Sequence, residues 1–166
     1  MTDFEALIKL LATAHVEFIL VGGAAATAHG ASRLTVDLDV VYGRSNQNLD
    51  RLTACLAPYH PYLRGAPEGL PFQLDTPTLR RGLNFTLITD VGALDLLGEI
   101  IGGGQYEDLL PHTIDIELFG VSCRCITLSR LIEVKRAAGR PKDLEALAEL
   151  EALQEERASN RKNPSS

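Results

Sequence analysis

The hydrophobic pattern of the N-terminal region changes its period twice. Between residues 3 and 15, apolar side chains recur every three or four positions, which predicts an amphipathic helix. Residues 17–21 form a short apolar and β-branched run that predicts a strand. Gly22 and Gly23 end this strand, and the alanine-rich segment behind them favours a helix that ends at Gly30.

The rest of the chain alternates between strand and helix patterns. Strands are predicted over residues 36–42, 84–90, 93–98, 113–119 and 121–127, and helices over residues 46–56, 128–139 and 141–157. Residues 57–82 are rich in Pro, Gly and Arg and are predicted to be irregular, either as a substrate loop or as a mobile connection. A second flexible loop is predicted over IGGGQ, residues 101–105.

This order of elements predicts an α/β (α+β) fold, in which helices flank a mixed β-sheet and a short helical pair ends the chain. The length of 166 residues fits one compact domain with a small helical appendix. We therefore expect an α/β core over residues 1–127, with C-terminal helices packed on it over residues 128–157. The polar stretch ASNRKNPSS, residues 158–166, is predicted to be a disordered tail.

The composition predicts an ordinary globular protein. Hydrophobic residues make up 45% and charged residues 23%, and the net charge of −6 argues against a surface built mainly to bind polyanions. The N-terminal segment lacks the pattern of a signal peptide, and no apolar run approaches the roughly 20 residues that span a bilayer. A cytoplasmic location without membrane contact is therefore expected. Cys55, Cys123 and Cys125 are interpreted as reduced core thiols.

Two aspartates interrupt the predicted strand over residues 36–42. Because side chains alternate along a strand, Asp37 and Asp39 project from one face with their Cβ atoms roughly 6 to 7 Å apart. Two carboxylates at this distance repel each other unless a proton or a cation intervenes. Mg²⁺ is the natural candidate because it prefers oxygen ligands. The alternative is that this face of the strand simply meets solvent.

Features on either side of the aspartate pair favour the metal site. The turn at Gly22 and Gly23 can bring backbone N–H groups against a phosphate that shares the metal. Downstream, Asp95 lies between Leu94 and Leu96 in another predicted strand. If that strand lay beside the first, the three carboxylates could hold two metal ions about 3.5 to 4 Å apart.

These motifs resemble the signature of the polymerase-beta-type nucleotidyltransferase superfamily, especially of its small bacterial minimal members. The resemblance rests on three motifs in suitable order and spacing, namely Gly22-Gly23, Asp37-Leu38-Asp39-Val40 and Leu94-Asp95-Leu96. Two longer segments, VGGAAATAHGASRLTVDLDVV and LIEVKRAAGRPKDLEAL, are similar to the toxin-like branch that includes abortive-infection nucleotidyltransferases. The resemblance spans residues 18–153.

The resemblance implies a metal-dependent nucleotidyltransferase, which moves an NMP group from an NTP to an acceptor hydroxyl and releases pyrophosphate. Asp37 and Asp39 would hold Mg²⁺, or Mn²⁺ in its place. Asp95 would be the third carboxylate at the metal and would activate the attacking hydroxyl. The acceptor would be a protein side chain, an RNA end or a small molecule, and a toxin-like member would have an antitoxin partner.

The resemblance also implies positions for the nucleotide. Gly22 and Gly23 would line the triphosphate, although Gly23 stands where many members have a serine that touches phosphate. Arg33, Lys135 and Lys142 are candidates for contact with the nucleotide. The alternatives are a surface ion pair for Arg33 and solvated side chains for the two helix lysines.

Two other functions compete with nucleotidyl transfer. A non-catalytic nucleotide-binding or protein-interaction module that retains the fold would suit the missing serine and the lack of a large substrate-binding domain. Dinucleotide binding is disfavoured, because GGAAATAHG does not contain G-x-G-x-x-G. Two aspartates are also more than a ribose hydroxyl requires.

Overall fold

The computed structural model describes residues 1–162, in which strands and helices follow one another along most of the chain. The strands are β1 (Phe18–Val21), β2 (Asp37–Tyr42), β3 (Tyr62–Leu63), β4 (Asn84–Thr89), β5 (Gly92–Leu97), β6 (Glu99–Ile100), β7 (Gly104–Gln105), β8 (Thr113–Leu118) and β9 (Val121–Ile126). The α-helices are α1 (Phe4–Thr13), α2 (Gly22–Ala28), α3 (Asn46–Leu56), α4 (Thr76–Arg81), α5 (Tyr106–Leu109), α6 (Leu128–Ala138) and α7 (Pro141–Lys162). Short 3-10 turns, η1 (Ala57–Tyr59) and η2 (Leu110–His112), follow α3 and α5.

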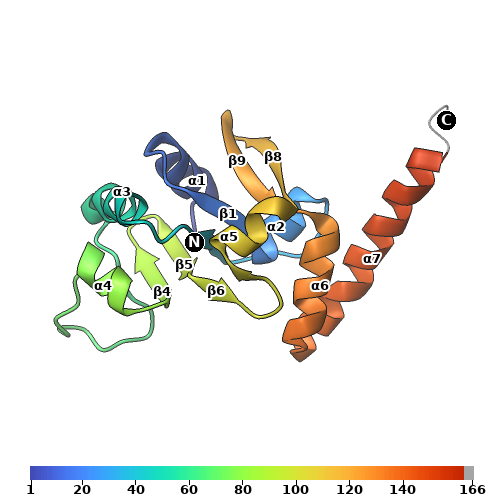
Figure 1. Cartoon of the computed structure of the whole chain (residues 1–166). Coiled ribbons are helices and arrows are strands. Elements are labelled where there is room, and N and C mark those ends of the chain that lie inside the picture. Colours follow the sequence, from blue (N-terminus) through green and yellow to red (C-terminus); the bar gives the residue numbers. More distant parts are fainter. Residues whose placement is uncertain (163–166) are drawn as a thin grey trace.

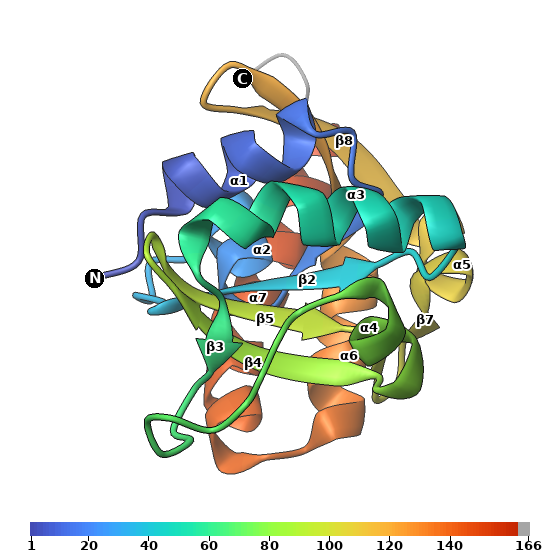
Figure 2. The same cartoon turned by 90° about the vertical axis from the view of Figure 1, so that its left-hand side faces the viewer.

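One mixed sheet of seven strands organises the molecule (Figure 1). Its strand order is β3-β4-β5-β2-β1-β9-β8, and β6 and β7 form a separate antiparallel pair. Helices α1 and α3 lie on one face of the sheet, and α2, α6 and α7 lie on the other (Figure 2). The expected α/β (α+β) fold, a mixed sheet flanked by helices, is confirmed.

The central position of β2 determines where its aspartates lie. β2 pairs antiparallel with β1 on one side and parallel with β5 on the other. Leu38 and Val40 point into the core and are fully buried. Because side chains alternate, Asp37 and Asp39 project from the opposite face, towards α6 and the start of α7.

Three segments predicted to be irregular contain helix or strand structure, although residues 64–75 have neither. Residues 57–82 contain β3 and helix α4, which begins behind Asp75, whose side chain accepts a hydrogen bond from Thr78 N (2.8 Å). IGGGQ takes part in the β6–β7 hairpin. Helix α7 runs to Lys162, so residues 158–162 of the predicted disordered tail are helical, and residues 163–166 lie outside the described part of the chain.

The core lies between the sheet and its two helical layers. Cys123 and Cys125 are both buried on β9, and burial raises the pKa of Cys125 to about 12, as expected for an inert thiol. His29 is also buried, with Nε2 donating to the Ile126 carbonyl (2.7 Å) and Nδ1 accepting from Arg157 (3.1 Å). Burial lowers the pKa of His29, so a neutral imidazole joins α2, β9 and α7.

Within residues 1–162, no helix combines the length and apolar character needed to cross a membrane.

Candidate active site

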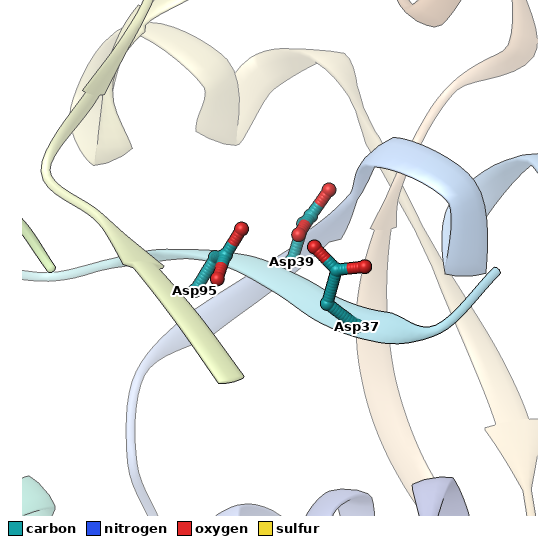
Figure 3. A group of neighbouring side chains, drawn as sticks. All are labelled: Asp37, Asp39 and Asp95. Atoms are coloured by element: carbon teal, nitrogen blue, oxygen red, sulfur yellow. The ribbon is translucent and has the colours of Figure 1, made fainter. Parts of the chain in front are cut away.

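Three carboxylates from two neighbouring strands gather on one face of the sheet (Figure 3). Asp37 and Asp39 come from β2 and Asp95 from β5, and the parallel register places Asp39 directly beside Asp95. One carboxylate oxygen of each residue lies within 4.8 Å of the other two. The structure thus brings together the three aspartates that the sequence pattern singles out, and we call them the carboxylate cluster.

Burial and mutual repulsion make Asp37 and Asp39 costly to ionise. Burial, and then the charges of Asp95 and Asp37, raise the pKa of Asp39 to about 7. The pKa of Asp37 is also raised, first by burial and then by Asp95, while the charge of Arg64 opposes the shift. Like charges held in this way cost stability, which favours a functional reason for the cluster.

The donor atoms of the carboxylate cluster suit a hard divalent cation. All three residues offer carboxylate oxygens, the ligand type that Mg²⁺ and Mn²⁺ prefer. Asp39 Oδ1 is buried and has no hydrogen-bond partner among residues 1–162. A cation would give this oxygen a partner and would neutralise the repulsion, so the residues present fit a metal ion.

Gly22 lies directly against the Asp39 side chain. Its φ of +63° lies in the left-handed region, and a Cβ on this residue would lie 2.2 Å from Asp39 Oδ2. The turn from β1 into α2 therefore requires glycine at position 22 for two reasons, its backbone conformation and the space that the Asp39 carboxylate fills.

Replacing Gly22 with alanine is expected to weaken Mn²⁺ binding by about 10- to 100-fold, because the added methyl group must displace the Asp39 carboxylate. Gly120→Ala is the matched control, since Gly120 has a φ of +80° but nothing within 4 Å of an added Cβ. Gly120→Ala should lose roughly 1–2 kcal/mol of stability to left-handed strain, and Gly22→Ala should lose more because its methyl group also meets Asp39. Calorimetric titration with Mn²⁺ measures the difference, and equal affinities in the two variants would contradict the role given to Gly22.

Gly23 has a close neighbour of its own. A Cβ on Gly23 would lie 2.6 Å from Thr35 Oγ1. Thr35 belongs to the loop before β2, and its hydroxyl donates to the Asp37 carbonyl oxygen (3.1 Å). The Thr35 side chain thus fills the space that a serine side chain at position 23 would need, which gives a physical reason for glycine there.

Two cations held by a buried aspartate face the carboxylate cluster. Asp143, whose side chain is 1% exposed, accepts from Arg140 Nε (2.6 Å) and pairs with Lys135 Nζ (3.4 Å). Burial by itself would raise the pKa of Asp143, but hydrogen bonds from Arg140 and the charges of Lys135 and Arg140 lower it overall. Asp143 is therefore a buried anion that fixes both cations beside Asp39, and we call Lys135 and Arg140 the cationic wall.

Two clefts meet at Asp39 and the cationic wall. The first has a volume of about 280 Å³, and its polar lining includes Arg33, Thr35, Asp37, Asp39, Lys135, Arg140 and Lys142. The second has a volume of about 340 Å³, and its apolar lining includes Leu97, Ile100, Ile101, Leu131 and Val134. Because Lys135 and Arg140 line both clefts, a ligand in either one lies beside the carboxylate cluster.

The other predicted nucleotide contacts also border these clefts. Arg33 lines the first cleft and forms an ion pair with Glu145 (3.6 Å), with half or more of each side chain exposed. Lys142 lines the same cleft, and its charge opposes the raised pKa of Asp37. Gly23 borders the first cleft and Gly22 the second. All of these positions therefore surround one site.

Arg64 is a member of the site that the sequence pattern does not reveal. It follows β3, and its Nη2 donates to Asp95 Oδ1 (2.8 Å) and to the Leu87 carbonyl oxygen (2.7 Å). Its Nη1 lies 3.7 Å from Asp37 Oδ2. The only sequence signal is its place in the long Pro-, Gly- and Arg-rich segment, because a single arginine before a glycine carries no periodic pattern.

Comparison with known proteins supports the fold. No protein-family model matches the chain, and no curated protein matches its sequence significantly. Among solved structures, the chain is similar to the crystal structure of a Thermotoga maritima protein proposed to be a nucleotidyltransferase. The TM-score is 0.54 at 14% identity, over 90% of this chain and 94% of the other. The chain thus has a nucleotidyltransferase-like fold, while the toxin-like branch stays a prediction.

Proposed function

We propose that this chain is a metal-dependent nucleotidyltransferase, which transfers an NMP group from an NTP to an acceptor hydroxyl and releases pyrophosphate. The observation that carries the proposal is the convergence of Asp37, Asp39 and Asp95 within 4.8 Å, beside the cationic wall. Phosphoryl transfer needs positioning and charge neutralisation more than covalent help from the protein. A carboxylate cluster next to fixed cations suits both needs.

In the proposed reaction, the acceptor oxygen attacks the α-phosphorus of the NTP. The bond from that phosphorus to the oxygen that bridges to the β-phosphate breaks, and pyrophosphate leaves with the electron pair. The proton of the attacking hydroxyl passes to a carboxylate. The resemblance makes Asp95 the candidate, and Asp95 lies at the side of the cluster next to β4.

Some residues of the site would hold the metal ion, and others would hold the phosphates. Asp37, Asp39 and Asp95 would hold Mg²⁺ or Mn²⁺, which when bound supplies positive charge to the transferring and leaving phosphates. The cations of the first cleft, Arg33, Lys135, Arg140 and Lys142, would hold the triphosphate. Gly22 and Gly23 would let the backbone approach it closely.

A transfer assay tests the proposal. The purified protein is incubated with Mg²⁺ or Mn²⁺, with cell extract, and with each NTP labelled at its α-phosphorus. The expected result is label on a protein, an RNA end or a small molecule, and no label with Asp95→Asn. Failure to label any acceptor with either metal would contradict catalysis. Calorimetric binding of an NTP in that case would favour the alternative, a non-catalytic nucleotide-binding module.

The resemblance in sequence supports a toxin-like role for the same activity, with an antitoxin as partner. Induced expression in a bacterial host is then expected to arrest growth, and Asp95→Asn is expected to relieve the arrest. Arrest of equal strength by both proteins would contradict this role without bearing on transfer itself.

A further inference from the structure

Arg64 is positioned by strand pairing. It directly follows β3, which pairs antiparallel with β4, and its backbone N–H donates to the Thr86 carbonyl oxygen (3.0 Å). Its guanidinium then donates to the carbonyl oxygen of Leu87, also on β4 (2.7 Å). Two hydrogen bonds to the sheet therefore hold this residue, so its place in the site does not depend on the irregular chain that follows it.

From this position, the guanidinium reaches two of the three carboxylates. Nη2 lies 2.8 Å from Asp95 Oδ1, and Nη1 lies 3.7 Å from Asp37 Oδ2. The side chains of Arg64 and Asp95 are only 32% and 19% exposed. The attraction is therefore less screened than in a surface ion pair. One fixed positive charge thus offsets part of the negative charge of the carboxylate cluster.

A divalent cation that binds the carboxylate cluster must meet the charge of Arg64. We propose that Arg64 is an internal counter-cation of the cluster that competes with the metal ion and so sets the metal affinity of the site. It is a positioning residue, since it holds Asp95 and Asp37 together when no other cation does. The inference rests on the metal-binding part of the proposed function and not on the transfer reaction.

If Arg64 competes with the metal ion, removing its charge should strengthen metal binding and not weaken it. The fixed positive charge of Arg64 repels a divalent cation bound to the same carboxylates, and its guanidinium occupies Asp95 Oδ1, an oxygen that the metal ion would use. Removing the charge of Arg64 should therefore tighten Mn²⁺ binding by about tenfold or more. If Arg64 only kept Asp95 in place, its removal would weaken Mn²⁺ binding instead.

Calorimetric titration of the full chain with Mn²⁺, without nucleotide, separates these outcomes. Arg64→Gln keeps a hydrogen-bond donor but removes the charge, and is expected to bind Mn²⁺ about tenfold more tightly than the wild type. Arg64→Lys keeps the charge and should bind with an affinity between these two. In EDTA, Arg64→Gln should also melt below the wild type, and Mn²⁺ should raise its melting temperature by the larger amount.

Arg44→Gln is the matched control. Arg44 donates to the Tyr42 hydroxyl (2.6 Å) and to the backbone carbonyls of Leu79 and Arg80 (3.2 Å each), and none of its contacts among residues 1–162 is with a carboxylate. Its variant should keep the wild-type affinity for Mn²⁺. Unchanged or weaker Mn²⁺ binding by folded Arg64→Gln, or equally tightened binding by Arg44→Gln, would overturn the proposed role of Arg64. Neither result would affect the metal-binding part of the proposed function. No binding by any of these proteins would overturn this inference together with the metal-binding part of the proposed function.

Discussion

Asparagine in place of Asp39 is expected to lower nucleotidyl transfer by at least about 10³-fold, which corresponds to several kcal/mol of transition-state stabilisation. Asp39 lies in the middle of the site, beside Asp95 in the sheet and at the junction of both clefts. The amide of asparagine keeps the shape of the carboxylate but loses its charge. The metal would then lose a ligand whose buried oxygen has no other partner among residues 1–162.

The same substitution is expected to stabilise the protein in the absence of metal. The pKa of Asp39 is about 7 in the folded protein and 3.8 in the reference state, so folding favours the protonated form. Protonation of Asp39 therefore adds to the free energy of unfolding. This contribution is complete below the unfolded pKa and is lost as the pH rises through about 7. At pH 8 the wild type therefore carries a penalty on the order of 1 to 3 kcal/mol that Asp39→Asn avoids.

Thermal unfolding in EDTA at two pH values, about 4 and about 8, measures this effect beside the transfer assay. The variant and the wild type should differ little at the lower pH, and the variant should melt higher at the upper one. Asp115→Asn is the control, because Asp115 is exposed on β8 at the far edge of the sheet. Wild-type transfer by Asp39→Asn, or a lower melting temperature at the upper pH, would contradict the role assigned to Asp39.

Alanine in place of Asp143 is expected to cost about 3 kcal/mol of unfolding free energy, at the low end of the range for breaking a buried ion pair. The side chain of Asp143 is 1% exposed and that of Lys135 is 18% exposed, so the lysine would lose its partner in a sheltered place. Arg140 is 59% exposed and can regain water, which limits the loss. The cationic wall would also lose its fixed position, so NTP binding should weaken.

Chemical denaturation and NTP titration of Asp143→Ala measure the two effects. Glu151→Ala is the matched control, because Glu151 also lies on α7 and pairs with Arg136 of α6 (2.7 Å), but both side chains are about half exposed. That surface pair should contribute less than about 1 kcal/mol. Equal stability losses in the two variants, or unchanged NTP affinity in Asp143→Ala, would argue against a buried anion that organises the cationic wall.

Local patterns were sufficient for most of the fold. The amphipathic spacing of α1 and α3 and their caps at Asp3 and Ser45, whose side chains accept from backbone N–H groups, are features of adjacent residues. Alternation along β2 likewise places Asp37 and Asp39 on one face without any knowledge of the neighbouring strands. Where elements are too short for a period, as in β3 and α4, the pattern predicts only irregular chain.

Local periodicity and short motifs were therefore enough to predict the main helices and strands, the shared face of Asp37 and Asp39, and Asp95 as a third acidic candidate. The packing of the elements, and no local pattern, places Asp95 beside Asp39, since this depends on the register of β2 and β5. It also decided that Arg64 reaches Asp95 and that Asp143 is buried beneath Lys135. These contacts join residues on different elements, and no repeat along the chain encodes which elements pack together.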